Sequence, residues 1–286
     1  MRAFIGISGD VFVGLMPTMT RATLSPAIQR VVSKHPNMKI HVTESYSPIL
    51  IQKVMAAELD FAVVPAFTGS RGLKVQHFLR TWESLVARPN NKLHLRRTRL
   101  RDVGPLKIVL PSHANARRGQ LETYFATNGV AIECVVEMDA MMGTLDLVAN
   151  SDWVTIIPAL MMTPEIDTMQ FSVAPLVDPT APLDLVVIEP MRRTLRPTGQ
   201  AFLEILREES GRLNKRWRPY YEQLCHQRGS TRSEPLVSPI AHTSLGHGAL
   251  PPRAISSTRT IIAATGQARR SVTSVTLPIK TASANA

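Results

Sequence analysis

Residues 11–65 constrain the fold more than any other part of the chain, because their apolar pattern switches repeatedly between two periods. Strands repeat every two residues and helices about every 3.6 residues, so the period separates the two. The pattern gives a strand at 11–15, a polar turn at 17–20, a helix over 24–34, a strand at 40–44, a helix from Ser47–Pro48 and a strand at 59–65. Strands that alternate with helices in this way predict a parallel sheet with crossover helices.

The same alternation continues to about residue 213. Further strands are expected at 75–79, 85–87, 106–110, 132–136, 154–157, 171–176 and 183–188. Helices are expected around Leu121, Leu145 and Phe202, and Asn128–Gly129 is a good helix stop because glycine tolerates positive φ. The stretch 88–101 is basic and polar, and we expect a loop there. The chain is therefore predicted to be an α/β protein.

Composition limits what such a protein can do. A chain of 286 residues buries a substantial core, and it has no apolar run of about eighteen residues that would span a bilayer. No secretory segment is recognisable, so we expect a cytoplasmic protein. Cys134 and Cys225 lie far apart without metal-ligand spacing, and we expect a buried thiol at Cys134 rather than a disulfide framework.

Charge and catalytic motifs narrow the function further. The net charge is +11, and the segment 217–286 is basic and rich in Ser, Thr, Pro and Arg. It has too little apolar periodicity to offset the entropy of ordering, so we expect disorder beyond Gly229. The chain lacks GxSxG, HExxH, P-loop and GxGxxG motifs. We therefore expect no enzyme activity, no cofactor and no metal site.

Several segments, in their order and spacing, carry a family resemblance. The phrase Glu58-Leu59-Asp60-Phe61-Ala62 stands within AAELDFAVVP, and matching segments follow at 83–87, 99–103, 148–158 and 201–206. Residues 8–213 resemble the effector-binding domain of LysR-type transcriptional regulators. The resemblance implies a two-lobed, periplasmic-binding-protein type II-like fold, in which two Rossmann-like lobes are joined by two crossovers. Lobe I would be 1–80 with 191–216, and lobe II would be 81–190. The family normally ends near residue 213, so 217–286 departs from it, and its composition predicts a disordered tail after a short extension of the last helix by Trp217, Tyr220 and Tyr221.

The resemblance also implies a cleft for a small, anionic effector between the lobes. Polar turns at helix starts suit an anion, although each hydroxyl is equally explained as a helix cap. The expected effector-binding residues are Thr18, Met19, Thr20, Ser47, Pro48, Ser112, Met138 and Asp139. Met138 stands where the family often has a small polar residue, and Asp139 also fits a helix cap. The methionines at 138, 141, 142, 161 and 162 are expected first to fill the core.

The resulting hypothesis is a small-molecule sensor that regulates transcription. Family members carry a winged helix-turn-helix ahead of this domain, whereas Met1 here falls just before the first strand. We therefore expect DNA contact only through a missing or partner helix-turn-helix module. The family implies antiparallel dimers or tetramers, through the helix at 25–34 and the helix near 120–128. The alternatives are a stand-alone solute-binding protein of the same fold and an enzyme on a two-lobed scaffold.

Overall fold

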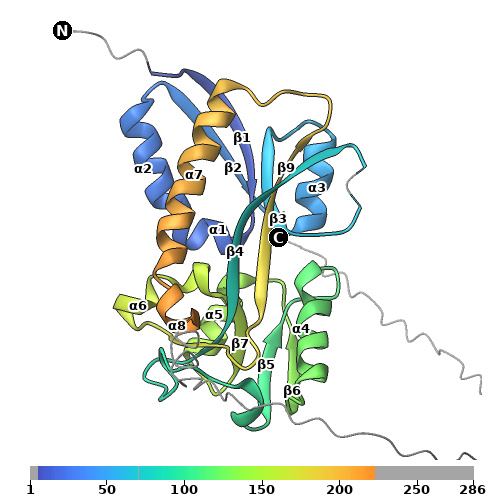
Figure 1. Ribbon diagram of the computed structural model, residues 1–286, viewed down its shortest axis with the longest axis vertical. Helices are drawn as coiled ribbons and strands as arrows, with labels where there is room; N and C mark the ends of the chain where they lie inside the picture. Colours follow the sequence, from blue (N-terminus) through green and yellow to red (C-terminus); the bar gives the residue numbers. More distant parts are fainter. Residues whose placement is uncertain (1–5, 70, 223–286) are drawn as a thin grey trace, which may run out of the picture. The chain divides into compact units, whose positions relative to one another are not determined.

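The computed structural model describes residues 6–69 and 71–222, which belong to one compact unit. The predicted disorder beyond Gly229 and the state of Cys225 lie outside the described residues. The chain folds as the predicted α/β alternation, with two lobes joined by two long strands (Figure 1). None of the helices in the described ranges is long and apolar enough to cross a membrane.

Lobe I is built from the N-terminal elements and one returning helix. Its elements are β1 (Gly9–Leu15), α1 (Pro17–Met19), the π-helix η1 (Thr20–Leu24), α2 (Ser25–Lys34), β2 (Met38–Glu44), α3 (Ser47–Met55), β3 (Phe61–Pro65) and α7 (Pro197–Lys215). The strands β2, β1 and β3 are parallel neighbours. The predicted helix of 47–55 and the strands around it are confirmed with nearly the expected bounds.

Lobe II again alternates strands with helices and contains a second set of parallel strands. Its elements are the 3-10 turn η2 (Leu100–Asp102), β5 (Leu106–Leu110), α4 (Ala116–Thr127), β6 (Ile132–Glu137), α5 (Met141–Ala149), β7 (Val154–Pro158), the 3-10 turn η3 (Ala159–Met162), α6 (Glu165–Thr168), β8 (Ser172–Pro175) and α8 (Arg218–Glu222). In this lobe β5 pairs in parallel with both β6 and β7. Gly129 follows α4 with φ +62°, as its predicted helix-stop role requires.

Two strands carry the chain between the lobes. They are β4 (Leu73–Ala87) and β9 (Pro182–Pro190), and the order of strands is β2-β1-β3-β9-β4-β7-β5-β6, with β8 also on β4. The first part of β4 pairs with β9, whereas Glu83 to Ala87 pair with β7 and β8 of lobe II. The sequence predicted two separate strands within β4. One continuous strand with a register shift between His77 and Leu79 links the lobes instead.

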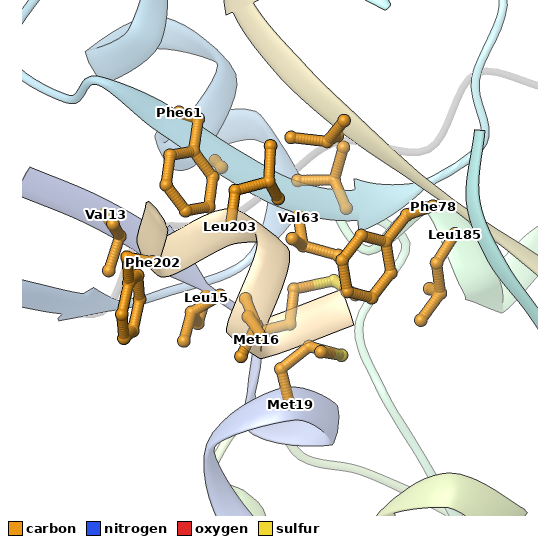
Figure 2. Packing of buried hydrophobic residues seen from close by; sticks show 14 of the residues in the cluster. Val13, Leu15, Met16, Met19, Phe61, Val63, Phe78, Leu185, Phe202 and Leu203 are labelled. Atoms are coloured by element: carbon orange, nitrogen blue, oxygen red, sulfur yellow. The ribbon is translucent and has the colours of Figure 1, made fainter. Parts of the chain in front are cut away.

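The core of lobe I lies between its sheet and the helices α2, α3 and α7. Val13 and Leu15 from β1, Phe61 and Val63 from β3, and Phe202 from α7 pack together there (Figure 2). Phe61 and Phe202 approach with ring centroids 6.3 Å apart. Burial of these side chains contributes about 1.5–3 kcal/mol each, which holds α7 on the sheet although it returns from the far end of the sequence.

Lobe II has two cores, one on each face of its sheet. Neighbouring residues on a strand point to opposite faces. Accordingly Val86 and Val109 enter one core while Leu85 and Ile108 enter the other. Helix α4 contributes Leu121 and Phe125 to the second core, and α5 and η3 cover the first.

The end of α7 and the helix α8 leave lobe I and pack on lobe II (Figure 1). We call residues 214–222 the C-terminal clasp. Trp217 is fully buried, and its indole N–H donates to the hydroxyl of Thr163 at 3.0 Å. The Tyr221 hydroxyl lies 2.7 Å from that of Ser84 and donates to the carbonyl of Glu83 at 3.0 Å. The domain boundary expected at residue 217 therefore falls inside a packed segment.

The chain after β1 is helical where a polar turn was expected. Pro17 is the first residue of α1, and the carbonyl of Met16 accepts hydrogen bonds from the amides of Met19 and Thr20 at 2.8 and 3.1 Å. Proline suits this position because its missing N–H has no partner in a first helical turn. The π-helical turn η1 then joins α1 to α2 without a break.

Candidate functional site

A cavity of about 510 Å³ lies between the two lobes, which is within the usual range for a small-molecule site. Lobe I contributes the start of α1, η1 and the end of β2. Lobe II contributes α5, η3 and the segment before β8. The lining residues are Pro17, Thr20, Arg21 and Glu44 from lobe I, and Met141, Met142, Leu145, Asp146, Met161, Gln170 and Phe171 from lobe II. We call this the interlobe cavity.

Arg21 ties the two lobes together at the wall of the interlobe cavity. Its guanidinium donates to the Glu165 carboxylate at 2.5 Å and to the Met161 carbonyl at 2.9 Å. Its charge also lies 5.8 Å from the centre of the Phe171 ring. Glu165 is fully buried and accepts further bonds from the Thr168 hydroxyl and the Phe171 amide, both at 3.0 Å. This network fixes the wall of the cavity, because a buried carboxylate needs all of these partners.

A second contact between the lobes lies close to the interlobe cavity. The Tyr46 hydroxyl donates to the backbone carbonyl of Asp139 at 2.6 Å. Burial, and to a smaller degree the charge of Asp139, raises the pKa of the Tyr46 hydroxyl above its ordinary value. The group is therefore a protonated donor at neutral pH. The lining residue Glu44 is two positions from Tyr46, and the lining residue Met141 is two positions from Asp139. The Tyr46–Asp139 contact therefore lies beside the cavity, whereas Arg21 is part of its lining.

Of the residues expected in lobe I, Thr20 alone lines the interlobe cavity. Its hydroxyl donates to the Glu44 carboxylate and contacts the Pro17 carbonyl at 3.2 Å. Thr18 is buried inside α1, and it does not cap the helix because Met16 holds that position. Met19 is fully buried in the core of lobe I. The amides of Met19 and Thr20 donate to the Met16 carbonyl and are therefore already paired within the chain.

Ser47 and Pro48 occupy the first turn of α3, one residue later than a capping role requires. Tyr46 is the N-cap residue, and no side chain caps this helix. The Ser47 hydroxyl is buried and lies 3.7 Å from the Met16 sulfur, while Pro48 is exposed. Ser47 and Thr18 thus lie in neighbouring turns at the strand ends of lobe I, as expected, but neither is among the residues that line the cavity.

In lobe II, Ser112 and Asp139 come together. The Asp139 carboxylate accepts a bond from the Ser112 amide at 3.0 Å, which joins the turn after β5 to the turn after β6. Asp139 does not cap α5, because Ala140 is its N-cap residue. Met138 is half-buried and packs against the core that α5 covers. The expected grouping of the two lobe II turns is therefore present, although its members lie outside the cavity lining.

The methionines divide between core and cavity. Met161 and Met162 are buried, as expected of core residues, and Met161 also reaches the cavity wall. Met141 and Met142 line the interlobe cavity, and Met142 is 72% exposed. A sulfur-containing, flexible side chain is able to reshape itself around a ligand, so this departure from core filling bears on binding.

A buried ion pair at the base of β4 was missed from the sequence. Arg117, in the first turn of α4, donates to both oxygens of the Glu83 carboxylate at 2.9 and 2.8 Å. The same guanidinium donates to the Ile156 carbonyl at 3.0 Å. The two residues stand 34 positions apart on a strand and a helix. No local pattern pairs them, and only the packing of α4 beside β4 brings them together.

The expectation of a buried thiol at Cys134 is wrong. Cys134 is a free, exposed thiol, because β6 is the edge strand of lobe II and its middle residues face solvent. Residues 6–69 and 71–222 contain no group of three or more His, Cys, Asp or Glu side chains placed to hold a metal ion.

Two α/β lobes, two crossing strands and a ligand-sized cavity between the lobes define the type II periplasmic-binding-like class of fold. Solved structures agree with this class. The chain is similar to the effector-binding domain of QuiR in complex with shikimate, with TM-score 0.58, 16% identity and coverage of 72% of this chain and 99% of that one. It is also similar to the BenM effector-binding domain with benzoate, with TM-score 0.58, 18% identity and coverage of 71% and 92%.

The sequence comparison gives the family. Residues 5–211 match the family described as the LysR substrate binding domain, so the chain belongs to that family. It is 21% identical over 201 residues to the nitrogen assimilation regulatory protein nac of Escherichia coli (strain K12), covering 70% of this chain and 65% of that protein. The corresponding regulator of Klebsiella aerogenes is 24% identical with the same coverage. The chain spans slightly less than two thirds of the length of these relatives.

Proposed function

We propose that this chain is the effector-sensing part of a LysR-type transcriptional regulator. A small molecule enters the interlobe cavity, changes the relation of the two lobes and thereby alters regulation of transcription. The observation that carries the proposal is the cavity itself, since residues of both lobes line it and one of them, Arg21, joins the lobes through Glu165. A second interlobe contact, Tyr46 with Asp139, lies two residues from the lining residues Glu44 and Met141. A ligand that contacts both walls has different affinities for the joined and the separated arrangement of the lobes. Such a difference in affinity is required for a ligand to shift the equilibrium between them.

Binding of a small molecule is tested by a thermal-shift screen. A ligand present at about 100 times its Kd stabilises the folded protein by about 2.7 kcal/mol, which raises Tm by several degrees. The screen should contain small acids, amines and neutral compounds of similar size. We expect at least one class to raise Tm with increasing concentration. If no compound of any charge shifts Tm, the sensing function is wrong.

The binding role of Thr18 and Ser47 remains a proposal that the same assay tests. Thr18→Val and Ser47→Ala remove the hydroxyls while keeping most of the volume, so the fold should persist. Both residues are buried outside the cavity lining, and Thr20 at the wall is the sharper candidate. Loss of a ligand's Tm shift in Thr18→Val or Ser47→Ala would place those hydroxyls at the site. An unchanged shift removes them, and leaves Thr20→Val as the decisive variant.

Transcriptional regulation is tested by a gel-shift assay. The chain is incubated with operator DNA alone and with a full-length homologue, in the presence and absence of a compound found by the screen. We propose that the chain affects specific DNA binding through a helix-turn-helix module rather than through its own lobes. A ligand-dependent change in the shifted band supports a regulator. A ligand that binds but never affects DNA binding favours a stand-alone solute-binding protein of the same fold.

We also propose that the domain pairs with a second copy through α2 and α4. Val32 on α2 is 53% exposed, so its apolar side chain is available to such a contact. Light scattering coupled to gel filtration should give the mass of a dimer or tetramer for the wild type. Val32→Asp should shift the mass toward the monomer, because it places a charge in an apolar contact. A monomeric wild type would exclude this pairing.

A further inference from the structure

Acidic side chains outnumber basic ones among the residues that line the interlobe cavity. Three such side chains line it, Arg21, Glu44 and Asp146. Arg21 forms an ion pair at 2.5 Å with Glu165, whose side chain is fully buried. The positive charge of Arg21 is thus balanced inside lobe II, and it offers little attraction to an anionic ligand.

The two carboxylates differ from Arg21, because no basic side chain in the described ranges pairs with them. Glu44 accepts the Thr20 hydroxyl, a neutral partner. Within the described part of the chain, neither Glu44 nor Asp146 has a Lys, Arg or His nitrogen within 4.0 Å, although nineteen other such contacts occur there. Both residues are exposed, so they lie where the cavity opens to water. Two negative charges face one cavity in a chain whose formal net charge is +11.

The inner surface of the cavity is apolar. Leu145, Met161 and Phe171 are buried at its wall, and Met141 and Met142 complete it. Thioether side chains are flexible and polarisable, so they adapt to apolar ligands of differing shape. A ligand that fills this space buries its own apolar surface, worth about 0.8 kcal/mol for each methylene group.

The backbone beside the cavity supplies a separate indication of a binding role. Thr20 and Arg21 begin the π-helical turn η1, Thr20–Leu24. π-helical turns are rare and are found frequently at functional sites, because the wider turn redirects side chains. Here the turn directs the Arg21 side chain into the cavity wall and across to lobe II.

We propose that the interlobe cavity binds an organic cation with an apolar body, such as a primary amine or a quaternary ammonium carried on an aliphatic or aromatic group. The cationic group lies at the mouth beside Glu44 and Asp146, and the apolar body lies against Met161, Leu145 and Phe171. The inference rests on the proposed sensing function, whose ligand it assigns to a chemical class. It replaces the anionic effector expected from the sequence, since a carboxylate would meet two like charges.

The ligand class is tested with matched probes that differ only in charge. The probes are hexylamine, 1-hexanol and hexanoate, together with benzylamine, benzyl alcohol and benzoate, measured by calorimetry at pH 7 and constant ionic strength. We expect each amine to bind about fivefold or more tightly than its alcohol, and the carboxylates to bind most weakly. From butylamine to hexylamine, affinity should rise about threefold to fourfold for each added methylene group.

Two variants locate the binding to this cavity. Glu44→Gln and Asp146→Asn each remove one charge while keeping side-chain size, and each should weaken hexylamine binding about threefold to fivefold. The double variant should remove most of the preference for amine over alcohol. Glu204→Gln is the matched control, because Glu204 is an exposed carboxylate on α7 that does not line the cavity. It should leave the affinity unchanged.

The outcomes separate this inference from the proposed function. Carboxylates or neutral compounds that bind while amines do not would overturn the ligand class but leave the sensor intact. Amine binding that is insensitive to both Glu44→Gln and Asp146→Asn would place the ligand elsewhere and overturn the inference. If the thermal-shift screen and all six charge-matched probes show no binding, both the ligand class and the sensing function are wrong.

Discussion

Glu83 and Arg117 are almost completely buried, and each supplies the partner that the other needs. Glu83 lies on β4 where this strand passes from its pairing with β9 to its pairing with β7. The amide of Glu83 also donates to the Ala181 carbonyl at 2.8 Å. This residue therefore fixes the point at which one of the two crossing strands enters lobe II, and Arg117 fixes α4 against it.

Removal of one member of this pair should destabilise the protein strongly. Arg117→Met leaves the Glu83 carboxylate buried without its bidentate partner, and such a change costs about 3–5 kcal/mol. Urea denaturation should show this loss as a lower midpoint with an unchanged slope. Arg88→Met is the control, because Arg88 is exposed, and it should change the unfolding free energy by less than about 0.5 kcal/mol. The double variant Glu83→Gln with Arg117→Met should recover part of the loss.

Single residues show where prediction from sequence succeeds and where it ends. Thr20 was expected at the site and does line the cavity, because it lies in the segment that connects β1 to α2, where the periodicity predicts the strand end. Arg21, the next residue, was not expected there. Its role depends on Glu165, which lies 144 positions away and carries no local signal of a partner. Side-chain pairing between lobes is a tertiary property that periodicity does not encode.

At the scale of elements, the C-terminal clasp is the feature that most affects stability. Trp217 is fully buried in a core of lobe II, and its neighbour Tyr221 stacks on Trp82 with ring centroids 4.8 Å apart. The Asn214 amide donates to the Arg80 carbonyl on β4 at 2.8 Å. The clasp therefore attaches the end of α7 to the other lobe by both apolar and polar contacts.

Trp217→Ala should reveal the contribution of the clasp. The substitution leaves a large cavity in lobe II, and loss of a buried aromatic side chain costs about 3–5 kcal/mol. Met191→Ala is a suitable control, since Met191 is 57% exposed and should contribute less than about 0.5 kcal/mol. Chemical denaturation of both variants gives the comparison. A loss below about 1 kcal/mol in Trp217→Ala would mean that the clasp adds little to the folded state.

The contact between α2 and α7 should make stability depend on acid pH. Burial alone would raise the pKa of Glu209, but hydrogen bonds from Arg30 and Arg212 outweigh it and lower the pKa below its ordinary value of 4.5. The folded state therefore favours the charged form. Its stabilisation is present above pH 4.5 and is lost as the pH falls through the lowered pKa.

This pH dependence is measured with Glu209→Gln. Thermal unfolding between about pH 7 and pH 3 should show a smaller loss of Tm in the variant than in the wild type over the acid part of the range. Arg30→Met should reduce the same slope, because it removes one of the two donors that lower the pKa. Parallel curves for wild type and Glu209→Gln would show that the carboxylate titrates alike in folded and unfolded chains.

Elements themselves were largely predictable, because their signals are local. The helix at 47–55 and the strand at 106–110 were expected with the bounds that are observed. The polar segment 17–20 was expected to be a turn and is helical, since Pro17 starts a helix that the fold continues into α2. Residues 214–216 were expected to end lobe I, and 217–222 were assigned to the tail as a short extension of the last helix, without a packing role. Its burial depends on a surface of lobe II that exists only once the whole chain has folded.

At the scale of the whole molecule, the described chain connects its lobes three times, through β4, β9 and the clasp. Arg21 and Tyr46 add side-chain contacts between the same lobes. Small domains joined by few contacts unfold separately, whereas extensive shared packing favours a single transition. We therefore expect the two lobes to unfold together.

The placement of the tryptophans allows this cooperativity to be measured. The chain has three, Trp82, Trp153 and Trp217, and all pack in or against one core of lobe II. Tryptophan fluorescence thus reports lobe II, while far-ultraviolet circular dichroism reports both lobes. The two urea transitions should coincide within about 0.2 M, as expected for a two-state transition. A fluorescence transition that precedes or follows the other would demonstrate independent unfolding of the lobes.

The clasp has a practical consequence for anyone who transplants this domain into a ligand-responsive fusion protein. A junction placed at residue 213, the last residue of α7 in the core of the first lobe, would discard the indole of Trp217 and leave one core of the second lobe uncovered. A fusion that extends through Glu222 keeps that cover, so nine further residues determine whether the domain folds with its second lobe fully packed.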